Sequence, residues 1–122
     1  MDRTWLLLGS GFAFLGVGLG AFGAHGLRSV LDTEALQTFE TGVRYQMYHA
    51  LGLLLLAALA PRLAEGPATW AGWLFTVGIV LFSGSLYLLA VTGTRWMGAI
   101  TPLGGVCFLA GWALVVYAGV RS

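Results

Sequence analysis

Hydrophobic residues fill four long stretches of this chain, and polar residues recur at only a few positions within them. The stretches are Trp5–Gly26, Tyr45–Ala60, Thr69–Val91 and Met97–Val120, and none of them contains Asp, Glu or Lys. About 20 apolar residues are enough for an α-helix to cross a bilayer. We therefore predict an all-α, polytopic membrane protein, a bundle of four transmembrane helices that forms a single domain of residues 1–122.

The polar residues inside these stretches are expected on one side of the membrane. Four crossings place both termini on one face, here called the near face, and the connections 27–44 and 92–96 on the other, the far face. A polar group without a partner in hydrocarbon costs on the order of several kcal/mol, so these side chains should meet one another or water. We expect a polar cluster, a chamber open to the far face, as the candidate ligand-binding site. Its predicted members are His25, Tyr45, Gln46, His49, Ser83, Ser85, Tyr87 and Thr101.

The second helix is predicted to begin well before its apolar run. Asp32 or Thr33 suits the N-cap position, and the helix should continue unbroken to about Ala60. At 1.5 Å per residue its length is about 40 Å, which exceeds the roughly 30 Å of hydrocarbon. The excess at the start of helix 2 is amphipathic and should lie at the far interface. Glu40 and Arg44 are four residues apart in this extension and are expected to form a surface ion pair.

Small residues recur along the first stretch with a heptad spacing. They are Gly9, Ala13, Gly16, Gly20 and Gly23, spaced four, three, four and three residues apart. Such a stripe lets another helix backbone approach closely. The stripe is interpreted either as a packing surface for a helix of the same chain or as a contact between copies in a homo-oligomer.

Composition supports the membrane class. Hydrophobic residues make up 58% of the chain and charged residues 9%, whereas soluble domains contain about 25% charged residues. The formal net charge is +1 and no basic patch suggests binding of nucleic acid. The expected partners are membrane lipid and, as an alternative, a second copy or another membrane protein. Arginines are divided equally between the two faces, so they do not predict an orientation.

The two histidines raise the question of chemistry. His25 and His49 lie toward the far ends of consecutive helices, where two imidazoles could ligate haem or a copper ion. No Cys-x-x-Cys or Met-rich segment accompanies them, so no metal and no cofactor is predicted. The other interpretations are neutral, hydrogen-bonded histidines or groups that handle a proton or a solute. No set of nucleophile, base and acid is visible, so no catalytic residue is predicted.

Four short motifs in this order resemble a known family. They are Gly20–Leu27, Tyr45-Gln46 with His49–Leu51, Leu81–Tyr87, and Thr101-Pro-x-Gly-Gly105 with Gly111-Trp112. Together they resemble the "domain of unknown function 423" family of small bacterial inner-membrane proteins, to which the eukaryotic transmembrane protein 256 group is similar. The resemblance covers almost the whole chain. It implies four membrane helices and a bacterial plasma membrane, with no established activity.

Three classes of function remain open at this point. The first is a structural or interaction protein, an accessory or homo-oligomeric membrane bundle in which the polar cluster fixes how the helices pack. The alternative is a module that binds or transports a small polar solute, a proton or a lipid headgroup at that cluster. A membrane enzyme or redox protein is the third.

Overall fold

The computed structural model describes residues 2–122, which form long helices joined by short connections. Four of these elements are long and apolar enough to cross a membrane: Arg3–His25, Thr33–Arg62, Glu65–Thr92 and Met97–Arg121. The all-α membrane fold predicted from the sequence is confirmed. The element bounds are α1 Asp2–His25, α2 Thr33–Leu59, the 3₁₀ turn η1 Ala60–Arg62, α3 Glu65–Gly78, the π-helical segment η2 Ile79–Ser83, α4 Gly84–Thr92 and α5 Met97–Arg121.

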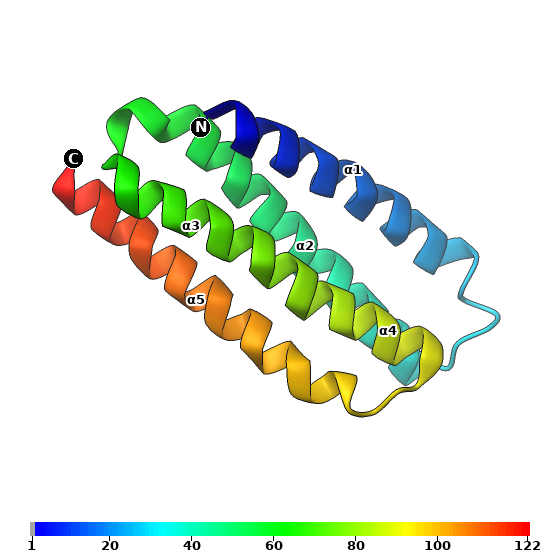
Figure 1. Cartoon of the computed structure of the whole chain (residues 1–122). Helices are drawn as coiled ribbons and strands as arrows, with labels where there is room; N and C mark the ends of the chain where they lie inside the picture. The colour runs from blue at the N-terminus through cyan, green and yellow to red at the C-terminus, as the bar shows by residue number, and fades with distance from the viewer. Residues whose placement is uncertain (1) are drawn as a thin grey trace.

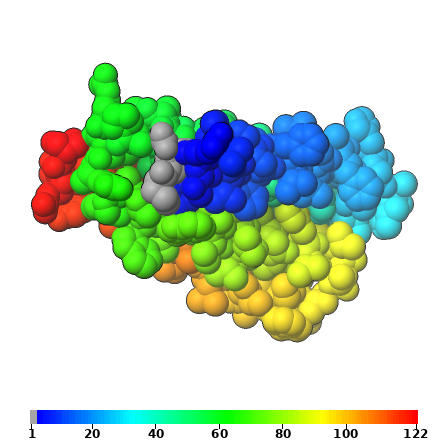
Figure 2. Space-filling model, turned by 45° about the horizontal axis from the view of Figure 1, so that its top comes forward, coloured from blue at the N-terminus to red at the C-terminus, as the bar shows by residue number. Residues whose placement is uncertain are grey.

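The helices run antiparallel along one bundle axis (Figure 1). Both termini lie at one end, and the 27–32 connection and the turn after α4 lie at the other. α1 forms one outer side of the bundle and packs chiefly against α2, while α5 packs chiefly against α3 (Figure 2). α2 contacts α1, α3 and α4. It is therefore placed to join α1 to the helices of the third span.

α2 begins at Thr33 because Asp32 caps it. The Asp32 carboxylate accepts a hydrogen bond of 2.8 Å from the backbone N–H of Ala35, one of the groups that a helix start leaves without a partner. In the extension that follows, Glu40 and Arg44 lie 3.9 Å apart with both side chains about 60% exposed. A pair this exposed and this long contributes little to stability.

The small-residue stripe of α1 faces α2 of the same chain. A Cβ built on Gly9, Gly16 or Gly23 would lie within 2.9 Å of an atom of α2, and one on Gly20 within 3.3 Å. These glycines therefore allow the two helices to approach more closely than any side chain would permit. Ala13, the fifth member, is partly buried and lines a shallow groove beside the contact.

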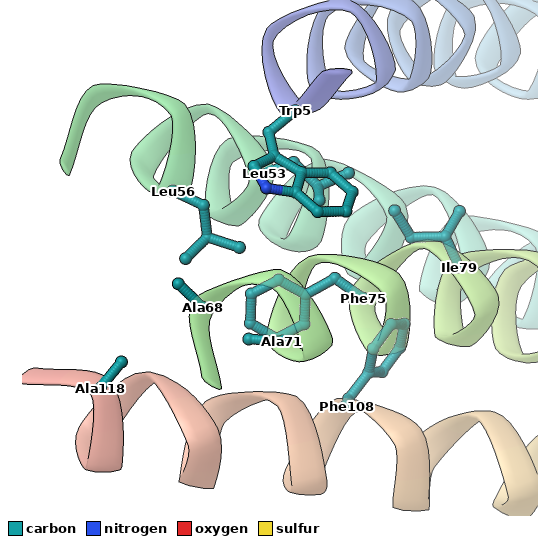
Figure 3. Close-up of a cluster of buried hydrophobic side chains, with 9 residues drawn as sticks. All are labelled: Trp5, Leu53, Leu56, Ala68, Ala71, Phe75, Ile79, Phe108 and Ala118. Carbon is teal, nitrogen blue, oxygen red and sulfur yellow. The ribbon is translucent and has the colours of Figure 1, made fainter. Parts of the chain in front are cut away.

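Aromatic residues fill the core between α2, α3 and α5 (Figure 3). Phe75 of α3 is completely buried and occupies the space that Gly52 of α2 and Gly111 of α5 leave open. Trp5 reaches from α1 onto Gly72 and is almost completely buried, so it ties the near end of α1 to α3. Large rings set against glycines are what keep these helices at a fixed spacing.

The third span contains an irregularity that its sequence did not predict. The N–H of Gly84 reaches the carbonyl of Ile79, five residues earlier, so one turn is wound as a π-helix. α5 approaches this turn so closely that a Cβ on Gly104 would overlap the backbone of Phe82. On the other side, a Cβ on Gly42 of α2 would lie 3.3 Å from the carbonyl oxygen of Ser83. The π-helical turn is thus enclosed by glycines of two neighbouring helices.

Candidate functional site: a polar network centred on α2

Gln46 connects three helices through its amide. Its Nε2 donates to the carbonyl of Phe12 in α1 at 2.8 Å, and its Oε1 accepts from the hydroxyl of Tyr87 in α4 at 2.5 Å. The side chain is 3% exposed. A buried amide with both of its ends engaged costs little to keep inside the bundle and holds the three backbones in one register.

The hydroxyls of the third span make two further links. Ser83 donates to the carbonyl of Gly42 in α2 at 2.6 Å, across the closest approach of the two helices. Ser85 and Thr101 share a hydrogen bond of 2.6 Å that joins α4 to α5. Serine suits these positions because its short side chain places an oxygen against a neighbouring backbone without separating the helices.

His49 is held as a neutral imidazole with a defined tautomer. The indole N–H of Trp112 can only donate, so Nε2 of His49, 3.0 Å away, must accept. The proton of the neutral ring is then on Nδ1, which donates to the carbonyl of Tyr45 at 2.8 Å. The ring also stacks on Phe108 with centroids 3.6 Å apart and planes 7° from parallel. Both nitrogens and one ring face are therefore occupied by the protein itself.

Most of these bonds involve α2, and together with the Ser85–Thr101 link between α4 and α5 they are here called the α2 network. Its side chains are Gln46, His49, Ser83, Ser85, Tyr87, Thr101 and Trp112. Within residues 3–122, no buried side-chain nitrogen or oxygen lacks a hydrogen-bond partner. The sequence predicts that these polar groups line a chamber, and in the structure they bond to one another or to backbone carbonyls.

His25 does not join this network. It is exposed at the end of α1, more than three helical turns beyond Phe12, which corresponds to about 20 Å along the axis. The sequence placed His25 with His49 because both lie toward the far side, but the network lies much deeper than the end of α1. In the described part of the chain, no group of three His, Cys, Asp or Glu side chains is close enough to hold a metal ion.

The network also reaches residues outside the predicted cluster, toward the near face. The carbonyl of Phe12 and the indole of Trp112 both take part, so the polar groups span the middle of the bundle as well as its far half. The position of Trp112 in the sequence could have predicted its part in the network. An indole N–H in the middle of an apolar span must find an acceptor, and few acceptors are available at that depth.

Tyr45 contributes its carbonyl to the network but not its hydroxyl. The side chain is 38% exposed and packs against Phe82 with ring centroids 4.7 Å apart. It borders a groove of about 480 Å³ on the outer surface, here called the lateral groove, which lies between α2, the π-helical segment and α5. The groove is lined by Tyr45, His49, Phe82, Pro102, Gly105 and Trp112, together with Val106, Phe108 and Leu109.

Comparison with known proteins agrees with this architecture. A family model described as "Protein of unknown function (DUF423)" matches residues 19–105. The UPF0382 membrane protein YwdK of Bacillus subtilis is 54% identical over 98% of this chain and 98% of its own length. The UPF0382 membrane protein SERP0230 of Staphylococcus epidermidis is 46% identical over 98% of this chain and 97% of its own. The corresponding protein SH2409 of Staphylococcus haemolyticus is 45% identical over 93% of each chain.

No solved structure matches the chain. The family match extends over the region that carries Gln46, His49 and the serines of the network, and the relatives align over nearly the full length. The relatives are named as membrane proteins, in agreement with the four long apolar helices. The chain therefore belongs to the DUF423 family of membrane proteins, for which no specific activity is indicated.

Proposed function

We propose that this protein is a structural or interaction component of the bacterial plasma membrane, in which residues 1–122 act as one domain. In this role the α2 network sets how the four helices pack, and the outer surface meets lipid and a protein partner. The bacterial relatives and the helical spans support the location. The closed state of the network is the observation that supports the role.

The energetics favour this role over ligand binding at the network. Hydrogen bonds between membrane helices contribute about 0.6 to 2 kcal/mol each. Links from α2 to α1, to the third span and to α5 together account for why the buried polar residues are present. A solute that entered would have to displace bonds such as that between Gln46 and Tyr87, at 2.5 Å, before it gained any of its own.

The outer surface of α1 supports the interaction part of the proposal. Large apolar side chains such as Leu7, Phe14 and Val17 are more than 60% exposed along this helix. In a bilayer this surface contacts acyl chains, and it is also wide enough to accept another helix. We propose a homo-oligomer or an accessory subunit of a larger membrane complex as the working assembly, with the glycine stripe already used by α2.

A paired experiment separates the structural role from transport. The wild type and Gln46→Leu would be reconstituted into vesicles and assayed for flux of protons and small polar solutes, and both would be unfolded in mixed micelles. The structural role predicts flux equal to that of empty vesicles for both proteins, with lower stability for Gln46→Leu. Flux by the wild type that Gln46→Leu abolishes would contradict the proposal and restore the transport alternative.

A further inference from the structure

The lateral groove is bordered by a tyrosine hydroxyl that the protein itself does not use, and a second such tyrosine lies nearby outside the groove. Tyr45 is 38% exposed and its neighbour Tyr48, with ring centroids 5.5 Å away, is 52% exposed. Neither hydroxyl has a hydrogen-bond partner among residues 3–122. The side chains of the α2 network are satisfied within the chain, whereas the Tyr45 hydroxyl beside the groove is open to a partner from outside it.

The groove begins next to the amphipathic extension of α2, at Tyr45, and continues along α5 toward the middle of the bundle at Trp112. Phe82, which packs on Tyr45, is about 15 Å along the helix axis from the end of α4 at Thr92. Water and lipid ester groups are scarce at that depth, because the hydrocarbon layer is about 30 Å thick. The ring of Tyr45 packs on Phe82 and lies near Phe108 at this level, so a molecule dissolved in the hydrocarbon can deliver a hydrogen-bond acceptor to its hydroxyl.

The lining of the groove restricts the shape of that molecule. Its walls are mainly aromatic and apolar, with Phe108 and Trp112 on α5 and Phe82 on the π-helical segment, and no charged residue borders it. Gly105 and Pro102 keep the floor low along α5. The volume of about 480 Å³ falls within the range of small-molecule sites. Flat rings stack favourably on such walls, whereas an ionic headgroup would find no partner.

We propose that the lateral groove binds an isoprenoid quinone. The quinone ring would lie against the aromatic walls, a ring carbonyl would accept a hydrogen bond from the Tyr45 hydroxyl, and the tail would leave the groove sideways into the bilayer. A quinone supplies the three properties that the groove requires: solubility in hydrocarbon, a flat ring and a carbonyl acceptor. The proposal concerns binding alone and does not depend on the structural role of the network.

Binding is tested on full-length protein in nanodiscs made from quinone-free lipid. A menaquinone with a short isoprenoid tail would be titrated in, and bound quinone would be quantified in the recovered nanodiscs by ultraviolet absorbance against empty nanodiscs. The wild type should show saturable binding near one quinone per chain. Tyr45→Phe, which removes one hydroxyl, should weaken binding about tenfold, and Gly105→Leu, which fills the groove, should abolish it.

Two control variants match these changes. Tyr48→Phe removes a hydroxyl from the same helix outside the groove lining, and Gly119→Leu adds a leucine to an open position on α5 away from the groove. Both should bind as the wild type does. Gly105→Leu does not require the helix backbones to move at its Cβ, because the one atom within 4 Å of that Cβ is on the Phe82 side chain, at 4.0 Å.

Four results would overturn the proposal. The first is a wild type that takes up no more quinone than empty nanodiscs, and the second is equal binding by Gly105→Leu. The third is equal binding of an isoprenoid alcohol of the same tail length, which would remove the role of the ring. A disulfide between two copies of Tyr45→Cys, formed in a Cys107→Ser background, would show that a second chain covers the groove and would also overturn it.

Discussion

The indole N–H of Trp112 donates to Nε2 of His49 across 3.0 Å and joins α5 to α2 near the middle of the bundle. This bond fixes the histidine in one neutral tautomer, with its remaining proton on Nδ1 and directed at the carbonyl of Tyr45. A residue that the sequence offered as a candidate ligand for metal or protons is therefore fully engaged as a connection between helices.

The tautomer of His49 is directly measurable. In ¹⁵N-labelled His25→Ala protein, which leaves one histidine, the nitrogen spectrum at neutral pH should show a neutral ring protonated on Nδ1. Trp112→Phe should change the Nε2 resonance toward that of a nitrogen without a donor, because the ring at position 112 remains but its N–H is lost. A ring protonated on Nε2 in the His25→Ala protein would show that the network is connected differently.

The side chains of Gln46 and Tyr87 should be energetically coupled through their hydrogen bond. Gln46→Leu and Tyr87→Phe are each expected to lower stability, and the double variant should lose less than the sum of the two. The coupling should be about 0.6 to 2 kcal/mol, as for other hydrogen bonds between membrane helices. Unfolding in mixed micelles, followed by circular dichroism, measures all four proteins of the cycle. Strict additivity would show that the two side chains do not interact in the membrane.

The close approach of α5 to the π-helical segment should make Gly104 intolerant of any side chain. A Cβ at this position would overlap the backbone of Phe82, so Gly104→Ala is expected to lower stability by about 1 to 3 kcal/mol, a typical cost of overpacking. Gly119→Ala on the same helix is the matched control, because its Cβ would meet nothing within 4 Å. This control should be neutral or slightly stabilising, and equal losses in the two variants would place the cause in the helix backbone instead.

The N-cap of α2 should contribute to stability independently of the packing between the membrane spans. Asp32→Ala removes the acceptor for the N–H of Ala35 and should cost about 1 kcal/mol. Asp32→Asn keeps an acceptor and should restore most of that loss. Because the cap lies outside the spans, hydrogen exchange should rise in the first turn of α2 while the amides around Gln46 stay protected. Exchange that rises along the whole helix would contradict this local view.

Much of the fold could be predicted from the sequence, because long apolar runs bounded by polar turns have few alternatives in a membrane. The start of α2 at Thr33 followed from the capping preference of Asp32, and the membership of Gln46, Ser83 and Tyr87 in a polar cluster followed from the cost of leaving polar groups unpaired. These inferences rest on local chemistry, which a single sequence contains.

The predictions of the polar cluster fail where a residue is placed only by its half of the membrane. His25 was grouped with His49 because both lie toward the far side, but their levels differ by several helical turns. The sequence analysis does not include Trp112 in the polar cluster, although its indole N–H needs an acceptor. Facing directions depend on the rotation of each helix about its own axis, which hydrophobicity barely constrains when every face is apolar.

The π-helical turn affects how a helical wheel is drawn for the third span and where the span tolerates a change in length. It accommodates one more residue than an α-helical turn, so a wheel drawn through residues 65–92 must skip a position near Ile79–Ser83 to put Phe75 and Tyr87 on the same side. Shortening this segment by one residue would give an ordinary helix whose two halves keep their present neighbours. Length variation of a single residue is thus best accommodated here, and nowhere else in the span without turning one half away from its partners.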